Sequence, residues 1–223
     1  MSSKLFNLKS LSKGIGYLVL FFILPSIILI PFLFIKSDSP FIYNLKLTIV
    51  YLISTIIFII IAKKEFKQSI KNLNLKILKK SIIYWLIGLA IMIISSELIE
   101  LIGIPLNSNE EAVRAQLKEF PIMQIMQTVI FAPIMEEIVF RYSFKNLSSN
   151  KHIYAIFTGI FFALMHLPDA FINPTMLIHL IPYSALGIAF GYIYKDTDNL
   201  LATIIPHSLH NLISILQLFI IGG

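Results

Sequence analysis

Three ionisable residues lie close together in a stretch that is otherwise apolar enough to span a membrane: Glu136, Glu137 and Arg141. Each charged side chain near the centre of a membrane helix costs about 2.5–3.5 kcal/mol, even on lenient insertion scales. Ionisable residues at such positions usually face the interior of a helix bundle, pair with one another and mark a functional site. The pattern therefore indicates a site with chemistry inside the membrane.

The spacing of these residues on a helix separates their roles. Residues four apart lie on one face, so Glu137 and Arg141 are placed to form an ion pair. Glu136 is rotated by about 100° from its neighbour and is left as a free carboxylate facing a cavity, a candidate general base. Pro133 precedes it, removes one amide donor and allows a bend. The alternative is a charge cluster at a helix end whose side chains reach back to the membrane surface.

Two further polar groups recur at one-turn spacing in later apolar segments. Phe162 and His166 share one helix face, although a lone histidine is more often a hydrogen-bonded structural residue than a catalyst. His207 and Asn211 share a face in the last apolar segment and offer converging hydrogen-bond donors. His210 lies about 60° from that face, as a helper or as a packing residue.

These residues come from three separate segments and can meet only inside a bundle. A carboxylate base, a second proton carrier and a pair of donors are the groups needed for water to attack a carbonyl carbon. Other catalytic sets are missing: the sequence has no H-E-x-x-H zinc helix, no G-x-S-x-G serine elbow and no cysteine. Water activated by a glutamate is the mechanism that remains.

The composition indicates that membrane helices position these residues. Hydrophobic residues make up 57% of the chain and charged residues 13%, against roughly 45–50% and about 25% in soluble domains. The sequence predicts an all-α, polytopic transmembrane helix bundle with about seven spans, in a range of six to eight, and an active site in an intramembrane cavity. The expected spans are 15–35, 42–62, 82–104, 121–144, 153–173, 176–194 and 199–220. Pro168 and Asp169 interrupt the fifth of them.

Positive charge is concentrated in alternate loops, which predicts an orientation. The net charge of +6 lies in short loops beside apolar segments, so it is a topology signal and no nucleic-acid partner is expected. The connection 63–80 holds seven lysines against a single acid, Glu65, and the N-terminal segment is also basic. The positive-inside rule then places the N-terminus in the cytosol. The 63–80 connection is either an amphipathic helix on the anionic inner leaflet or a solvated basic loop.

The three motifs together resemble those of a known family. In order and approximate spacing they are similar to the successive motifs of the CPBP family, the CAAX-protease and bacteriocin-processing proteins also called Abi: Glu136-Glu137-x-x-x-Arg141, Phe162-x-x-x-His166 and His207-x-x-x-Asn211. The resemblance covers roughly residues 121–215 and is specific as an ordered set. We therefore expect N-terminal membrane helices over 1–120, with the basic cytosolic loop 63–80, and a catalytic helix core over 121–223.

The resemblance implies an all-helical intramembrane endopeptidase, which we expect in a bacterial plasma membrane, acting on a peptide or membrane-protein substrate. By the resemblance, Glu136 and His166 activate the water, while His207 and Asn211 stabilise the oxyanion. The residues expected to support the site are Glu137, Arg141 and Phe162. Members of this family are linked to prenylated proteins, bacteriocin maturation, self-immunity or peptide signalling, and the sequence does not select among these substrates.

Three other interpretations stay open. A zinc site needs about three protein ligands, which Glu136, His166 and His207 could supply. The H-E-x-x-H spacing is absent, however, and Asn211 suits a donor better than a ligand, so no cofactor is expected. A non-catalytic immunity or scaffold protein that binds a toxin would need none of these four residues. A proton-coupled transporter would use bundle glutamates as a relay, but no inverted repeat is visible.

Overall fold

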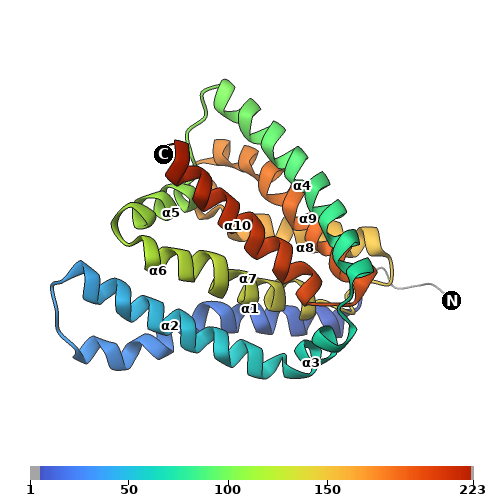
Figure 1. The fold of residues 1–223 in the computed structure, drawn as a ribbon, viewed down its shortest axis with the longest axis horizontal. Coiled ribbons are helices and arrows are strands. Elements are labelled where there is room, and N and C mark those ends of the chain that lie inside the picture. The colour runs from blue at the N-terminus through green and yellow to red at the C-terminus, as the bar shows by residue number, and fades with distance from the viewer. Residues whose placement is uncertain (1–5, 222–223) are drawn as a thin grey trace.

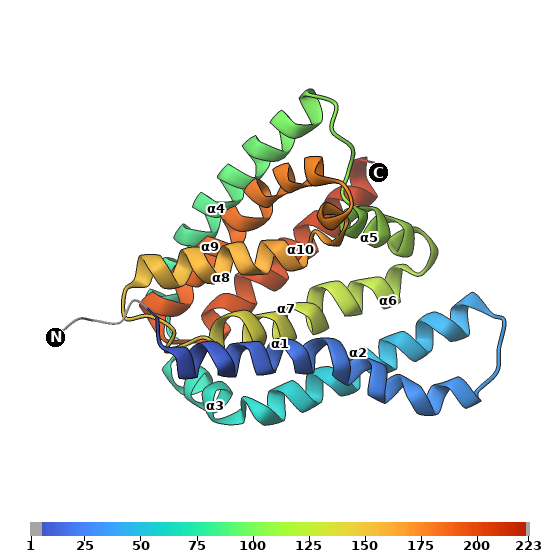
Figure 2. The same cartoon turned by 180° about the vertical axis from the view of Figure 1, so that it is seen from behind.

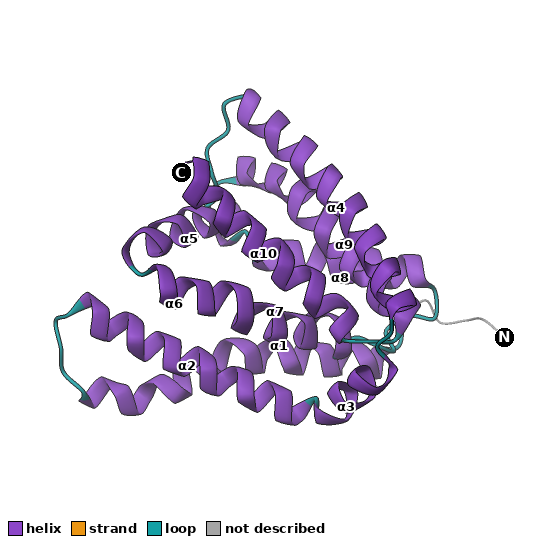
Figure 3. Ribbon diagram, in the orientation of Figure 1, coloured by secondary structure: helices purple, strands orange, loops and turns teal. Residues whose placement is uncertain are grey.

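The computed structural model describes residues 6–221, and over this range its regular structure is entirely helical (Figure 3). The all-α fold class predicted from composition is confirmed. Ten α-helices are joined by short 3₁₀ turns (η1, η4, η5) and π-helical stretches (η2, η3) (Figure 1). In chain order the elements are α1 (Leu8–Leu29), η1 (Ile30–Phe34), α2 (Pro40–Ile61), α3 (Lys63–Asn72), α4 (Leu75–Leu101), α5 (Ser108–Glu119), α6 (Pro121–Ile125), η2 (Met126–Phe131), α7 (Ala132–Glu137), η3 (Ile138–Tyr142), α8 (Lys151–Met165), η4 (Pro168–Phe171), η5 (Pro174–His179), α9 (Leu180–Thr197) and α10 (Leu201–Ile221).

Six helical stretches in the described part of the chain are long and apolar enough to cross a membrane. They are Leu8–Phe34, Pro40–Ile61, Leu75–Leu101, Pro121–Tyr142, Pro174–Thr197 and Leu201–Ile220. Their outward faces are apolar, as expected where lipid replaces water as the solvent. The number of spans lies at the lower end of the predicted range.

The prediction of a span over 153–173 is wrong. Helix α8 ends at Met165 and has 15 residues, which gives a length of about 22 Å, shorter than the roughly 30 Å hydrocarbon core. Pro168, which cannot continue a helix, opens the 3₁₀ turn η4 three residues later. His166 consequently lies at the end of a helix, where its side chain can turn toward neighbouring elements.

Asparagine side chains set where several helices begin. Asn7 accepts hydrogen bonds from the backbone of Lys9 and Ser10, so α1 starts earlier than the predicted residue 15. Asn74 accepts from the Ile77 N–H in the same way, and α4 therefore starts at Leu75, inside the basic connection. The other asparagine caps stand before α5, α8 and α10: Asn107, Asn150 and Asn199. The side-chain oxygen satisfies amide groups that a helix start leaves unpaired.

The helix that carries Glu136 lies in the middle of the bundle. Helix α7 packs against α2 and α10, and η3 packs against α1 and α8. Figures 1 and 2 show this central run from opposite sides, with the α1–α2 hairpin along one flank and α8–α10 along the other. Its apolar side chains Met135, Ile138 and Phe140 are buried in one core cluster with Phe58 and Phe162. The most buried part of the protein therefore surrounds the ionisable motif.

Helices α8 and α9 approach each other closely through glycines. A Cβ atom added to Gly187 would lie 2.7 Å from the Gly159 carbonyl oxygen, and one added to Gly191 would lie 2.7 Å from the Ala155 Cα atom. Small residues that let two backbones meet are a common device in membrane bundles, where apolar side chains gain little by leaving lipid. This contact holds the two helices that present His166 and its neighbours.

Replacing Gly187 with alanine is expected to destabilise the fold by about 1–3 kcal/mol, because the backbone of α8 must move to admit the methyl group. Thermal unfolding of the detergent-purified protein measures this change. Gly16→Ala is the control, since an added Cβ there meets nothing within 4 Å and alanine favours a helix. Equal unfolding temperatures for the two variants would contradict the close approach.

Candidate active site

Helical geometry changes twice around the glutamates. Pro133 has no amide hydrogen to donate, and the backbone on both sides of α7 is π-helical over Met126–Phe131 and Ile138–Tyr142. Ala132, for example, donates to the carbonyl of Gln127, five residues earlier. The two glutamates thus lie on a short α-helical piece between two wider turns. Such π-helical stretches occur frequently at functional sites.

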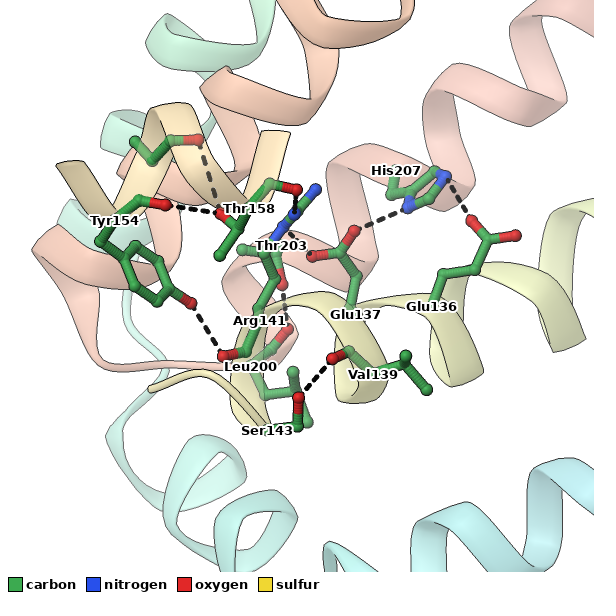
Figure 4. Close-up of polar contacts among 11 residues, drawn as sticks. Glu136, Glu137, Val139, Arg141, Ser143, Tyr154, Thr158, Leu200, Thr203 and His207 are labelled. Atoms are coloured by element: carbon green, nitrogen blue, oxygen red, sulfur yellow. Dashed lines mark hydrogen bonds and ion pairs between the residues drawn. The ribbon is translucent and has the colours of Figure 1, made fainter. Parts of the chain in front are cut away.

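Glu137 is fully buried and belongs to a charged network (Figure 4). Its Oε1 lies 2.9 Å from Nδ1 of His207, and its Oε2 lies 3.2 Å from Nε of Arg141. The second contact is an ion pair without the alignment of a hydrogen bond. Arg141 also donates to the Thr158 carbonyl at 3.1 Å, and its own carbonyl accepts from the Tyr154 hydroxyl at 2.8 Å. The pairing expected from the four-residue spacing is therefore present, and it extends to two further helices.

The Glu136 side chain points away from Arg141 and toward the imidazole rings of His166 and His207. Its Oε1 lies 3.8 Å from Nε2 of His166, and its Oε2 lies 3.6 Å from Nε2 of His207. The side chain keeps 12% of its surface exposed, whereas Glu137 keeps none. Both distances exceed those of a direct hydrogen bond. The structure therefore brings together the free carboxylate and both candidate histidines.

The His166 ring is fixed by its surroundings. Its Nδ1 lies 2.9 Å from the Phe162 carbonyl oxygen, which can only accept, so this nitrogen carries the hydrogen and Nε2 faces Glu136. The ring packs between two aromatic side chains. The Phe162 centroid lies 4.2 Å away and the Tyr183 centroid 5.3 Å away. Phe162 thereby contributes both its carbonyl and its ring to the placement of His166.

Tyr183 is a neighbour of the site that the sequence did not reveal. Its hydroxyl donates to the Asn107 side chain at 3.4 Å and accepts from the Asn109 amide at 3.2 Å. Both asparagines lie at the start of α5, which is joined to η4 by a hydrogen bond from the Ser108 N–H to Asp169. The aromatic ring that covers His166 is thus held by α5. One tyrosine in an apolar segment carries no signal that could have identified this role.

Loss of the Tyr183 ring is expected to reduce the turnover of the endopeptidase activity that the family resemblance implies. Tyr183→Leu removes the stack and should lower kcat by roughly tenfold with little change in KM, because His166 is less well oriented. Tyr183→Phe keeps the ring and should recover most of the rate. Tyr192→Leu on the same helix is the control, since Tyr192 stacks on Tyr84 instead. Steady-state kinetics of the detergent-purified variants measure kcat and KM. Equal losses of kcat for Tyr183→Leu and Tyr183→Phe would reject the stacking role.

Asn211 is placed differently from the histidines. Its Nδ2 donates to the Thr128 carbonyl oxygen at 2.8 Å, in the π-helical stretch η2. The Thr128 hydroxyl in turn accepts from the Gln124 amide at 2.8 Å. An amide nitrogen has two hydrogens, so one donor of Asn211 remains after this bond. The contact joins α10 to the helix of the glutamates and fixes the orientation of the amide.

The ionisable groups of the site could in principle bind a metal ion. The part of the chain that the structure describes contains no group of three or more His, Asp or Glu side chains that could hold a metal ion. In the cluster, Nδ1 of His207 contacts Glu137, while Nδ1 of His166 contacts a carbonyl. These contacts leave Nε2 of both histidines facing Glu136, so the zinc interpretation stays open and metal independence remains a prediction for experiment.

The C-terminal half of the chain matches a family model. Residues 118–213 match the model described as type II CAAX prenyl endopeptidase Rce1-like. The UPF0177 protein YxdF of Lactococcus lactis subsp. lactis (strain IL1403) is 25% identical over 174 residues, which cover 72% of this chain and 89% of that protein. The protein named "Putative membrane peptidase YdiL" of Bacillus subtilis (strain 168) is 25% identical over 108 residues, or 47% and 41% of the two chains. No solved structure matches.

The matched region contains all three motifs and every candidate site residue from Glu136 to Asn211. Together with the six long apolar helices in residues 6–221 and the similarity to the protein named "Putative membrane peptidase YdiL", this match supports an integral membrane protein. The family resemblance predicted from the ordered motifs is confirmed. Over residues 118–213 this chain is therefore similar to the Rce1-like type II CAAX prenyl endopeptidases, the CPBP or Abi proteins.

Proposed function

We propose that this protein is an intramembrane endopeptidase that hydrolyses a peptide bond with water activated by Glu136. The observation that supports the proposal is the convergence of one free carboxylate and two imidazoles inside the bundle, with Nε2 atoms at 3.8 and 3.6 Å from its oxygens. Glu137 already neutralises Arg141, so the structure does not need Glu136 for charge balance. An unpaired carboxylate inside a membrane bundle costs free energy, and ionisable residues at such positions usually belong to a functional site.

In the proposed reaction, one water molecule lies between Glu136 and His166. Glu136 accepts a proton from this water as its oxygen forms a bond to the carbonyl carbon, and His166 accepts a second hydrogen bond from the water at Nε2. The carbonyl oxygen becomes an oxyanion. The proton then passes from Glu136 to the leaving nitrogen as the carbon–nitrogen bond breaks, which gives an acid and an amine.

The oxyanion would be stabilised by His207 and Asn211. Nδ1 of His207 donates to Glu137, so donation from Nε2 to an oxyanion requires that the ring carry both hydrogens. The Glu137 carboxylate accepts from Nδ1 of His207 at 2.9 Å, and its other oxygen lies 3.2 Å from Nε of Arg141, so the ring is held in place from the side away from the substrate. Asn211 supplies its second amide hydrogen. The buried Glu137–Arg141 pair thus acts on the site through His207, without contacting the substrate.

The substrate of this chain is a peptide or a membrane-associated protein in this proposal. The family model is named after prenylated CAAX proteins, and such substrates belong in the first assay beside unmodified peptides. A role in bacteriocin maturation or self-immunity is the corresponding physiological proposal. We place the protein in a bacterial plasma membrane. Because lysines are concentrated in the N-terminal segment and in α3, the positive-inside rule puts both in the cytosol.

The test is cleavage of a peptide library by the detergent-purified protein, with products identified by mass spectrometry and with a chelator in a parallel sample. Half of the library carries a C-terminal lipid. Defined cleavage products are expected, at the same rate with and without the chelator, because the proposed reaction uses only side chains and water. Binding of peptides without any cleavage would instead support the non-catalytic immunity or scaffold function, and loss with the chelator would reject metal independence.

A further inference from the structure

Six exposed lysines form one surface at an end of the bundle, and we call it the lysine surface. It consists of residues on α3 and on the first turns of α4: Lys63, Lys64, Lys67, Lys71, Lys76 and Lys79. Two apolar side chains lie among them, Ile70 at 66% and Leu75 at 68% exposure. Figure 1 shows α3 between the ends of α2 and α4, both of which are long enough to span the membrane.

The orientation of α3 about its axis is fixed by its inner face. Glu65 and Ser69, one turn apart, are buried. The Glu65 carboxylate accepts from the Tyr194 hydroxyl at 2.9 Å and pairs with Lys145 at 3.3 Å. The Ser69 hydroxyl accepts from the Leu200 N–H at 2.9 Å. Because these contacts hold one face of α3 against the core, its lysines must face outward.

The charge of this surface is not neutralised by the protein. The only acid between residues 63 and 80 is Glu65, and it is buried. Three other lysines at this end have acidic partners: Lys80 and Lys151 pair with Asp196 at 3.1 and 3.3 Å, and Lys145 pairs with Asp198. Burial opposes the charge of Lys145, yet Asp198 and Glu65 outweigh it and raise its pKa. None of the six lysines of the lysine surface forms an ion pair within residues 6–221.

A cluster of unpaired lysines with apolar side chains between them, beside two membrane spans, has the chemistry of a headgroup-binding surface. Apolar side chains can enter the acyl boundary while the ammonium groups contact phosphate oxygens. Each basic residue near an anionic leaflet contributes attraction, which falls off within a Debye length. A solvated loop would need neither the fixed inner face nor the exposed Ile70 and Leu75.

We propose that the lysine surface binds the headgroups of anionic phospholipids. The inner face of α3, opposite this surface, contacts Lys145 just after η3 and Leu200 just before α10. The proposal concerns lipid binding and does not depend on the proposed peptidase function. It also identifies the 63–80 connection as an amphipathic helix rather than a loop, as α3 now shows for Lys63–Asn72.

The test uses the full chain in lipid nanodiscs that contain spin-labelled phosphatidylglycerol or phosphatidylcholine. Electron paramagnetic resonance gives the fraction of each lipid held by the protein. The wild type should hold more phosphatidylglycerol, and Lys67→Gln combined with Lys71→Gln should reduce this preference at least roughly twofold, as should about 0.5 M salt. Lys67→Arg with Lys71→Arg should keep the preference, because the charge is kept.

The matched control is Lys36→Gln with Lys118→Gln, which removes the same charge from exposed lysines in the α1–α2 loop and at the end of α5. This variant should keep the preference of the wild type. The proposal is overturned if the Lys67 and Lys71 substitutions leave lipid selectivity unchanged, or if both pairs reduce it equally. Unfolding temperatures in phosphatidylcholine alone should be the same for all variants, because exposed lysines carry no packing role there.

Discussion

Replacing Glu136 with glutamine is expected to lower peptide hydrolysis by about a hundredfold to ten-thousandfold, with little effect on folding. Glutamine has nearly the same shape but cannot accept a proton from water, and general bases contribute about 10²–10⁴-fold to such rates. Glu136 makes no contact at hydrogen-bond distance to either histidine, so its amide analogue leaves no buried charge unpaired. Single-turnover cleavage in detergent measures the rate, and binding of the same peptide should survive.

Glu97→Gln is the matched control for this change. Glu97 is an exposed glutamate on α4, and the same substitution there should leave the rate unchanged. If the Glu136→Gln protein cleaves as fast as the Glu97→Gln protein, Glu136 is not the base. An unfolding temperature far below that of the wild type would instead show that Glu136 has a structural role.

Replacing Arg141 with methionine is expected to destabilise the protein by about 3–5 kcal/mol. The substitution keeps an apolar stem of similar length but leaves the Glu137 carboxylate buried with one partner fewer, and an unpaired buried charge is strongly unfavourable. It also removes the bond to the Thr158 carbonyl, which ties η3 to α8. Thermal or denaturant unfolding in detergent measures the loss. Adding Glu137→Gln should recover part of it, because the charge then disappears.

A second pair in the same chain provides the control. Arg114 and Glu110 have the same four-residue spacing, and Nε of Arg114 lies 2.9 Å from Oε1 of Glu110. Their side chains, however, are 38% and 33% exposed. Arg114→Met should therefore cost no more than about 0.5 kcal/mol. Equal losses for Arg141→Met and Arg114→Met would show that the buried pair contributes no more than a surface pair does.

The sequence predicted those contacts of the site that depend on helical spacing. Glu137 and Arg141 are one turn apart, so their pairing follows from local geometry whatever the rest of the fold does. The same spacing joins Phe162 to His166 through a carbonyl and a ring contact. The separation of Glu136 from Glu137 on the helix also holds, since Glu136 faces the Nε2 atoms of His166 and His207. Glu137 instead contacts Arg141 and the Nδ1 atom of His207.

Contacts between distant segments could not be predicted in this way. Tyr183 and Asn107 are 76 residues apart in the chain, and Asn211 and Thr128 are 83 apart. Their meeting depends on how α5 and η2 pack, which no local pattern encodes. The end of α8 could not be predicted for a related reason. Apolar residues continue past Met165 into the 3₁₀ turns, and composition alone does not distinguish a helix from a loop there.

We propose that Glu136 and His166 act on the same water molecule, and this claim can be tested directly. The most direct test compares single-turnover cleavage rates of Glu136→Gln, His166→Ala and the double variant. Groups that serve one step are non-additive, so the double variant should be no slower than Glu136→Gln alone, within about threefold. Losses that multiply in the double variant, or a His166→Ala protein that cleaves at the wild-type rate, would contradict the claim.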